Sequence, residues 1–301
     1  SSPCCLLSPS GICQPPYLMG CRARAVSPMA LTDDQLARYA RHILLPEIGG
    51  AGQAKIMNAK VLVVGAGGLG SPVILYLAAA GVGTIGIIDD DIVELSNLQR
   101  QIVHITDRIG GTKAESAKEM VAALNPDVTV TVHAERLTAE NAQNIMSGYD
   151  FVADGSDNFA TRFLINDACY FFGKTLVSAA ILRFDGQLST FKAHGRTDPE
   201  QDPCYRCLFP VAPPPDTVPT CAEAGVLGAL CGVLGSLQAT ELLKEITRAG
   251  ASMSGALLIV DGLGTEFRKV KIKPDPECAL CGPQATITNL TSHGGQAPTA
   301  L

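Results

Sequence analysis

Two matched pairs of cysteines constrain the fold of this chain more than any other feature. Both pairs have the spacing Cys-x-x-Cys; they are Cys204 with Cys207 and, about seventy residues later, Cys278 with Cys281. One such turn presents two thiolates to a metal ion, and two turns complete a tetrahedral zinc site. Two redox pairs or four reduced core thiols are the alternatives. We predict a structural zinc site that holds these two distant segments together.

The other cysteines favour a reducing environment. The chain has 11 cysteines, an odd number, and shows no signal peptide, which argues against a disulfide framework. Cys169 and Cys231 lie in apolar helical stretches, where we expect them to be buried as small hydrophobic residues. We therefore predict a cytoplasmic location.

Composition argues against two classes of partner. The net charge of −6 disfavours nucleic acid. The longest apolar run, 224–237, is shorter than the ~20 residues that cross a bilayer. Only 17% of residues are charged, below the usual ~25%, and 47% are apolar. This balance predicts a large core or a buried subunit interface.

The two ends of the chain differ from its middle. Residues 1–28 contain no acidic residue and many Ser, Pro and Cys, a bias shared with organellar transit peptides, but no long amphipathic helix is apparent. We interpret them as a disordered extension or a non-native leader. Residues 284–301 are polar and small, as expected of a flexible tail. Residues 29–283 then form one domain.

That domain alternates between expected strands and helices. A capping box at 32–35 opens the first helix, and Gly173 suits the end of a helix that starts near Asn158. The expected strands are 61–64, 84–88, 128–132, 149–153, 175–181, 186–192 and a pair within 256–271, with a helix over 226–248. The pattern predicts an α/β fold with a Rossmann-like, doubly wound, largely parallel sheet and a C-terminal antiparallel extension. Such sheets bind ligands beyond the carboxyl ends of their strands.

A glycine-rich turn follows the first strand. The run Gly65-Ala-Gly67-Gly68-Leu-Gly70 has the G-x-G-x-x-G spacing and opens a helix. Its glycines let backbone N–H groups approach a phosphate, and the helix N-terminus favours negative charge. Asp89 ends the next strand and can accept from ribose hydroxyls. The motif alone fits nicotinamide, flavin or ATP.

Three charged residues favour a triphosphate. Arg100 follows the acidic strand end, and Lys113 lies in the first turn of a helix, where its charge and the helix N-terminus converge. Asp157 follows the strand at 149–153 and is suited to hold a magnesium ion that bridges phosphates. Each taken singly could be a surface charge or a helix cap. Together, at one edge of the sheet, they favour ATP.

These ordered motifs resemble the MoeB/ThiF/HesA family, bacterial relatives of the ubiquitin-activating enzymes. The matching segments are 38–41, 65–70, 89–101, 156–158, 204–207, 235–238 and 278–281. The resemblance implies ATP- and magnesium-dependent adenylation of the C-terminal glycine of a ubiquitin-like sulfur carrier protein. The pathways implied are molybdopterin, thiamine or related sulfur-transfer biosynthesis. It also implies a homodimer with the active site near the dimer interface.

The resemblance also implies roles for individual residues. The implied nucleotide-binding set is Gly65, Gly67, Gly68, Asp89, Ser96, Asn97, Leu98, Gln99, Arg100, Lys113, Asp157 and Asn158. Within this set Asp89 would hold the ribose and Asp157 the magnesium ion. Arg41 would reach the γ-phosphate in the partner subunit's site. The four paired cysteines would be the zinc ligands.

Cys221 lies in a Pro-rich loop and matches the cysteine that some family members use as a sulfur-transfer nucleophile. A helix just after it could lower the thiol pKa, whereas a bystander thiol is the alternative. Some eukaryotic relatives append a rhodanese domain that donates sulfur. The few residues after Gly282 cannot form such a domain, so we expect a separate protein to donate sulfur.

Two other functions fit the same fold. One is a nicotinamide- or flavin-dependent oxidoreductase, which Arg100, Lys113 and the zinc motif disfavour. The other is a non-catalytic binding relative, which the presence of Arg41 and Asp157 disfavours. Adenylation of a sulfur carrier is therefore the predicted function, and the sequence leaves the identity of the carrier open.

Overall fold

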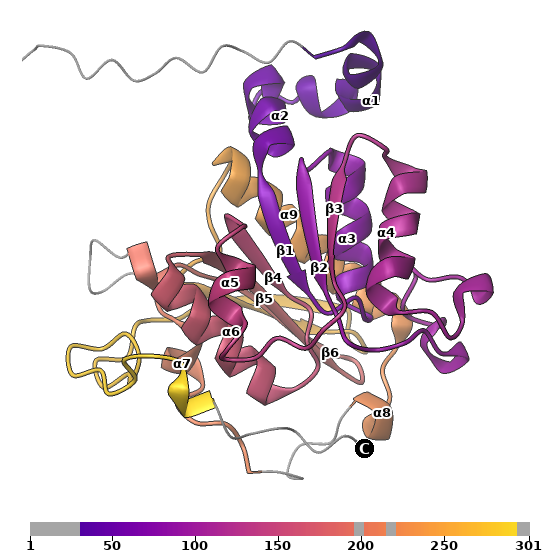
Figure 1. Ribbon diagram of the computed structural model, residues 1–301. Coiled ribbons are helices and arrows are strands. Elements are labelled where there is room, and N and C mark those ends of the chain that lie inside the picture. The colour runs from indigo at the N-terminus through magenta and orange to yellow at the C-terminus, as the bar shows by residue number, and fades with distance from the viewer. Residues whose placement is uncertain (1–30, 196–201, 215–220, 294–301) are drawn as a thin grey trace, which may run out of the picture.

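The computed structural model describes residues 31–195, 202–214 and 221–293 (Figure 1). The segment 1–28, interpreted above as an extension or leader, lies outside the described residues. The strands are β1 (Lys60–Val64), β2 (Thr84–Ile88), β3 (Thr129–His133), β4 (Phe151–Asp154), β5 (Thr175–Leu182), β6 (Asp185–Phe191), β7 (Ala256–Asp261) and β8 (Glu266–Lys271). The helices are α1 (Asp33–Ile43), α2 (Gly49–Asn58), α3 (Gly70–Ala80), α4 (Lys113–Leu124), α5 (Ala142–Met146), α6 (Phe159–Phe172), α7 (Tyr205–Leu208), α8 (Cys221–Ala224) and α9 (Gly228–Thr247).

All of these strands form one sheet in the order β3-β2-β1-β4-β5-β6-β7-β8. Strands β1 to β5 pair in parallel, and β5 to β8 pair antiparallel. The parallel part winds in opposite directions from the boundary between β1 and β4, which makes the carboxyl ends of these two strands the topological switch point. The predicted doubly wound sheet with a C-terminal antiparallel extension is confirmed.

Helices cover both faces of the parallel strands (Figure 1). Val61 and Val63 of β1 belong to the core cluster beneath α3, α4 and α9, whereas Leu62 and Val64 belong to the cluster beneath α5 and α6. Successive side chains of a strand point to opposite faces, so a strand buried on both sides has no polar alternation. This explains the unbroken apolar runs of the sequence.

The helix ends agree with the sequence signals. Thr32 and Gln35 form the predicted capping box at α1, with each side chain accepting from the other's backbone N–H at 3.2 Å. Gly173 ends α6 in the left-handed conformation, with φ of 67°. Helix α4 stops at Leu124, just before Asn125-Pro126.

The sequence does not predict helix α2, because its glycines lower helix propensity. The helix forms in this structure because it packs against α1 and α9. Gln53 in its middle is fully buried and donates from Nε2 to the carbonyl of Ala80 at 2.9 Å. Tertiary packing therefore outweighs local preference here.

The flexible tail expected at 284–301 stays a prediction, although three residues of its described part, Ile287, Leu290 and His293, contact the domain. His293 Nε2 lies 2.8 Å from the fully buried carboxylate of Asp167, which also forms a two-bond ion pair with Arg206 at 2.8 Å. Burial raises the pKa of Asp167, but the hydrogen bonds from His293 and Arg206 outweigh it and lower the pKa. A buried carboxylate needs such partners, and the segment supplies one. Residues 294–301 lie outside the described part.

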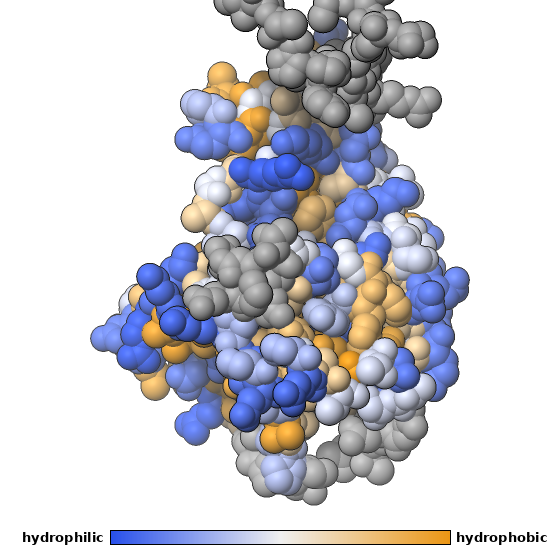
Figure 2. Space-filling model, turned by 90° about the vertical axis from the view of Figure 1, so that its left-hand side faces the viewer, coloured by the Kyte–Doolittle hydropathy of each residue, from blue (hydrophilic) through white to orange (hydrophobic). Residues whose placement is uncertain are grey.

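Some large apolar side chains reach the surface. Figure 2 shows one side of the domain, where apolar patches lie among hydrophilic residues. Tyr76, Ile102 and Phe267 are more than half exposed and line an open groove between α3, α9 and β8. No helix in the described ranges is long and apolar enough to cross a membrane.

Asn125 joins three elements at the end of the sheet where the strands begin. Its side chain is fully buried and donates to the Tyr39 hydroxyl at 2.9 Å and to the Ala78 carbonyl at 2.8 Å. Replacing Asn125 with Ala takes this donor from the buried Tyr39 hydroxyl and removes one of the two hydrogen bonds to the Ala78 carbonyl, which still accepts from the Gly81 N–H. We therefore expect a loss of about 1–3 kcal/mol in the free energy of unfolding, measured in urea. Lys118→Ala, at an exposed position of α4, is the control and should cost less than about 0.5 kcal/mol. Equal urea unfolding midpoints for Asn125→Ala and Lys118→Ala would contradict this account.

Candidate nucleotide and zinc sites

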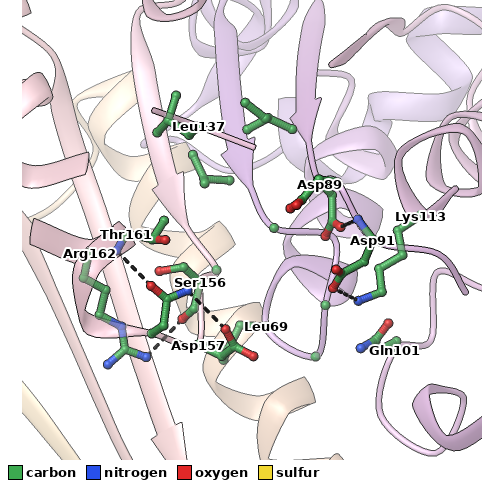
Figure 3. A pocket seen from close by; sticks show the side chains of 18 of the residues that line it. Leu69, Asp89, Asp91, Gln101, Lys113, Leu137, Ser156, Asp157, Thr161 and Arg162 are labelled. Carbon is green, nitrogen blue, oxygen red and sulfur yellow. Dashed lines mark hydrogen bonds and ion pairs between the residues drawn. The ribbon is translucent and has the colours of Figure 1, made fainter. Parts of the chain in front are cut away.

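A cleft lies at the switch point, beyond the carboxyl ends of β1, β2 and β4 (Figure 3). The glycine-rich turn after β1, the acidic run 89–91 after β2 and residues 155–158 after β4 line it, together with Lys113 from α4. Three separate segments of the chain thus meet at the place where doubly wound sheets bind their ligands.

Close backbone packing explains the glycines of the turn. A side chain on Gly70 would lie 1.8 Å from the carbonyl oxygen of Gly65, and Gly65 itself has φ of 90°. Among the described residues, the N–H groups of Gly67 and Gly68 make no hydrogen bond. With the start of α3 immediately behind them, they form an anion-binding cradle that fits a phosphate.

Asp89 ends β2 beside this turn. Its Oδ2 accepts from the Ala66 N–H at 2.7 Å and its Oδ1 from the Asp91 N–H at 2.9 Å. Burial raises the pKa of Asp89, and nearby Lys113 opposes that shift. Each carboxylate oxygen keeps a further lone pair, so Asp89 can still accept from a ribose hydroxyl.

Two cations flank the cradle. Lys113 is buried and pairs with Asp91 at 2.7 Å, and Figure 3 shows its side chain reaching toward the cleft. The guanidinium of Arg100 donates to the Ser96 carbonyl at 3.1 Å, and Arg100 also lines the cleft. Two positively charged side chains in the same cleft suit a polyphosphate.

The strand β4 contributes the opposite wall. Asp157 is exposed, and its carboxylate lies within the cleft (Figure 3). Asn158 caps α6 by accepting from the Thr161 N–H at 2.9 Å. Among the described residues no cation pairs with Asp157, so its oxygens fit the hard-oxygen ligands that Mg²⁺ prefers.

The structure does not bring every predicted nucleotide residue into the cleft. Residues 96–99 lie beside it rather than on its wall; Asn97 is buried and accepts from the Glu94 N–H at 3.3 Å. Arg41 is exposed on α1, which packs at the end of α4 far from Lys113 through a 3.0 Å bond from Arg38 to Leu124. A direct role for these residues stays a prediction.

Other cleft residues were not predicted. Asp91 and Arg136 line it, as does Arg162, which is buried and donates from Nη2 to the Ser156 carbonyl at 3.0 Å. The position of Arg162 four residues after Asn158 places both on one face of α6, which is the signal that could have revealed it.

Cys231 is buried as predicted, yet it also lines the cleft, where a side chain on Gly68 would meet its sulfur at 3.0 Å. Cys169 is buried as predicted.

The four paired cysteines form a second site, away from the cleft. Sulfur–sulfur distances are 3.5 Å for Cys204–Cys278, 3.4 Å for Cys207–Cys281 and 3.9 Å for Cys204–Cys207. Four thiolates about 2.3 Å from one zinc ion would be spaced by about 3.8 Å, whereas a disulfide requires about 2.05 Å. Hydrogen bonding from Cys204 lowers the pKa of Cys207 to about 7 and also lowers that of Cys278. The donor set and spacing fit zinc.

Comparison with known proteins agrees with this geometry. Residues 39–280 match the ThiF family. The chain belongs to the ThiF family. The resemblance stated from the sequence is thereby confirmed.

Several curated relatives of this ThiF-family chain are 48% identical to it. The sulfur carrier protein adenylyltransferase of Thermus thermophilus aligns over 88% of this chain and 97% of its own length. The SAMP-activating enzyme E1 of Haloferax volcanii aligns over 84% and 92%. The adenylyltransferase and sulfurtransferase MOCS3 of Mus musculus aligns over 88% of this chain but 56% of its own length, so it is the longer protein.

Solved structures resemble the fold at lower identity. A crystal structure of E. coli MccB with ATP has a TM-score of 0.69 and 21% identity, and covers 85% of this chain and 75% of that one. MccB with a MccA variant gives a TM-score of 0.71 at 22% identity, with 81% and 75% covered. These similarities establish the shared fold of this ThiF-family protein.

The zinc site of this ThiF-family protein can be tested by removing one thiol. Cys207→Ser should lower the zinc content from one ion per chain and reduce the melting temperature by roughly 10 °C, because metal binding is coupled to folding. Elemental analysis and thermal unfolding measure the two effects. Cys169→Ala, which removes a buried thiol outside the cluster, should destabilise the protein but leave the zinc content unchanged. Freshly purified, reduced protein without zinc would refute the site.

Proposed function

We propose that this protein is an ATP- and magnesium-dependent adenylyltransferase that activates the C-terminal glycine of a ubiquitin-like sulfur carrier protein. One observation carries the proposal. The cleft combines two backbone N–H groups, of Gly67 and Gly68, that no described residue accepts from with two cations and two carboxylates, which belong to Lys113, Arg100, Asp89 and Asp157. The names of the Thermus and Haloferax relatives support a carrier protein as substrate. Molybdopterin, thiamine or related sulfur-transfer pathways are the proposed context.

The proposed reaction needs no nucleophile from the enzyme. The carrier's terminal carboxylate attacks the α-phosphorus of ATP, a bond forms between them, and pyrophosphate leaves with the broken bond's electrons. Magnesium, when bound at Asp157, would neutralise phosphate charge. The N–H groups of Gly67 and Gly68 orient the phosphates, and Arg100 and Lys113 balance the charge that builds up on the leaving group. Catalysis is therefore positioning and preorganised charge.

Two variants test the assigned cleft. Asp157→Ala and Arg100→Ala should each reduce carrier-dependent exchange of pyrophosphate into ATP by about 100-fold or more, because each removes a preorganised charge. Asp127→Ala, an exposed carboxylate at the opposite end of the sheet, serves as the matched control and should exchange at the wild-type rate. Wild-type exchange in both cleft variants would exclude this site, and tight NAD binding without ATP binding would favour an oxidoreductase.

We also infer a homodimer. The groove between α3, α9 and β8 leaves Tyr76, Ile102 and Phe267 exposed, and an apolar surface of this kind suits a second copy of the chain. Arg41 lies on α1, remote from the cleft of its own chain. In the proposed dimer it reaches the γ-phosphate in the partner's cleft.

Mixing two inactive variants tests this arrangement. Arg41→Ala and Asp157→Ala should each be inactive alone, but their heterodimers contain one cleft with both residues intact. Exchange of subunits should therefore restore up to about a quarter of the wild-type activity. No recovery, with mixed dimers shown to form by mass spectrometry, would place Arg41 outside the partner's site.

Cys221 is proposed as the nucleophile of a later sulfur-transfer step, with sulfur supplied by a separate donor protein. Its backbone begins α8, and its side chain lies outside the described residues. Its thiolate would attack the carrier acyl-adenylate, forming a thioester and releasing AMP. The proposed cytoplasmic location would keep this thiol and the zinc ligands reduced.

Cys221→Ala separates the two steps. It should leave pyrophosphate exchange unchanged within about twofold, because adenylation uses no thiol. It should also abolish the covalent carrier–enzyme adduct that mass spectrometry detects in the wild type. An adduct that persists in the variant would reduce Cys221 to a bystander.

A further inference from the structure

His104 is buried beneath the glycine-rich turn, only 4% exposed, and its two ring nitrogens contact two different segments. Nε2 lies 2.9 Å from the carbonyl oxygen of Ala66, and Nδ1 lies 2.9 Å from the hydroxyl of Ser116. A carbonyl oxygen can only accept, so Nε2 carries the proton and donates to Ala66, while Nδ1 accepts from Ser116. Burial lowers the pKa of His104 to about 4, and the cations of Lys113 and Arg108 add to this effect. The ring is therefore neutral near pH 7.

The bond to Ala66 controls the direction of the next N–H group. A trans peptide is planar, so the Ala66 carbonyl and the Gly67 N–H point in opposite directions. Because His104 holds this carbonyl on the protein side, the Gly67 N–H is turned toward the cleft, where no described residue accepts from it. On the other side of Ala66, its own N–H donates to Asp89 at 2.7 Å. Both peptide planes of Ala66 are thus fixed.

The bond to Ser116 connects the turn to a second wall of the cleft. Ser116 lies on α4, one turn after Lys113, and is itself buried. The imidazole is a rigid ring, so it sets the spacing between the glycine turn and the helix that carries the Lys113 cation. His104 therefore holds in place both the backbone N–H of the glycine turn and the helix that carries the Lys113 cation.

We propose that His104 is a positioning residue for the nucleotide phosphates: through Ala66 it aims the Gly67 N–H, and through Ser116 it keeps α4 and Lys113 at the distance that a polyphosphate requires. This inference rests on the proposed use of ATP. Its distinctive consequence is that a change at His104 should weaken the binding of ATP but not that of adenosine. His104 acts on the phosphate end of the cleft and not on the nucleoside end.

Two conservative variants separate the two hydrogen bonds. The side-chain amide nitrogen of Gln extends about as far as Nε2, so His104→Gln keeps a donor for Ala66. The amide of Asn ends near the Nδ1 position, so His104→Asn can still accept from Ser116 but loses the bond to Ala66. Asn125→Ala is the matched control: it also breaks a buried polar contact, at the other end of α4.

The measurement is the dissociation constant of ATP beside that of adenosine, with thermal unfolding to verify folding. His104→Asn should weaken ATP binding at least tenfold and change adenosine binding less than about twofold, because the lost bond orients a phosphate donor. His104→Gln should bind ATP within about threefold of the wild type. Asn125→Ala should lower the melting temperature without changing the ratio of the two constants. Should His104→Asn not fold, Ser116→Ala, which keeps the bond to Ala66, is expected to weaken ATP binding by about threefold and to leave adenosine binding unchanged.

Three results would overturn the inference: unchanged ATP binding in His104→Asn, equal weakening of ATP and adenosine, or a loss in His104→Gln as large as that in His104→Asn. A wild-type protein that does not bind ATP would instead refute the proposed function. The two failures are therefore distinguishable.

Discussion

The close approach of two backbone turns at the boundary between β1 and β4 is the constraint on which the cleft depends. A side chain on Gly65 would lie 3.0 Å from the carbonyl oxygen of Gly155, so the turns after these strands touch through bare backbone. Because β1 pairs with both β2 and β4, the acidic end of β2 and the polar end of β4 are held on either side of this contact. Short turns directly after β2 and β4 are therefore enough to place the polar residues of both walls in the cleft. The sheet itself fixes their positions before a ligand binds.

Helix α6 connects the cleft with the four-cysteine site. It begins at the Asn158 cap, on the wall of the cleft, and in its middle Asp167 pairs with Arg206, which lies between the first two cysteines. The four-cysteine cluster is therefore connected through α6 to the turn that carries Asp157.

The sequence was sufficient for features with a local or periodic signal. The strands, the capping box at Thr32, the glycine turn and the cysteine pairs each follow from residue types at a fixed spacing, and the structure agrees. The sequence could not show that Asn97 points inward while Arg100 points to the cleft, because neighbours in an irregular segment share no periodicity. Helix α2 was hidden by its glycines, and the importance of His104 depends on contacts with residues 38 positions earlier and 12 positions later. Such long-range contacts leave no local pattern.

The contact between His293 and Asp167 joins two distant parts of the chain. His293 is fixed to Asp167 on α6, and Arg206 of α7 shares the same carboxylate. One buried carboxylate therefore holds the last described residue of the chain and the first cysteine turn at the same point of α6. A change at Asp167 would release both segments together, although they are distant in the sequence.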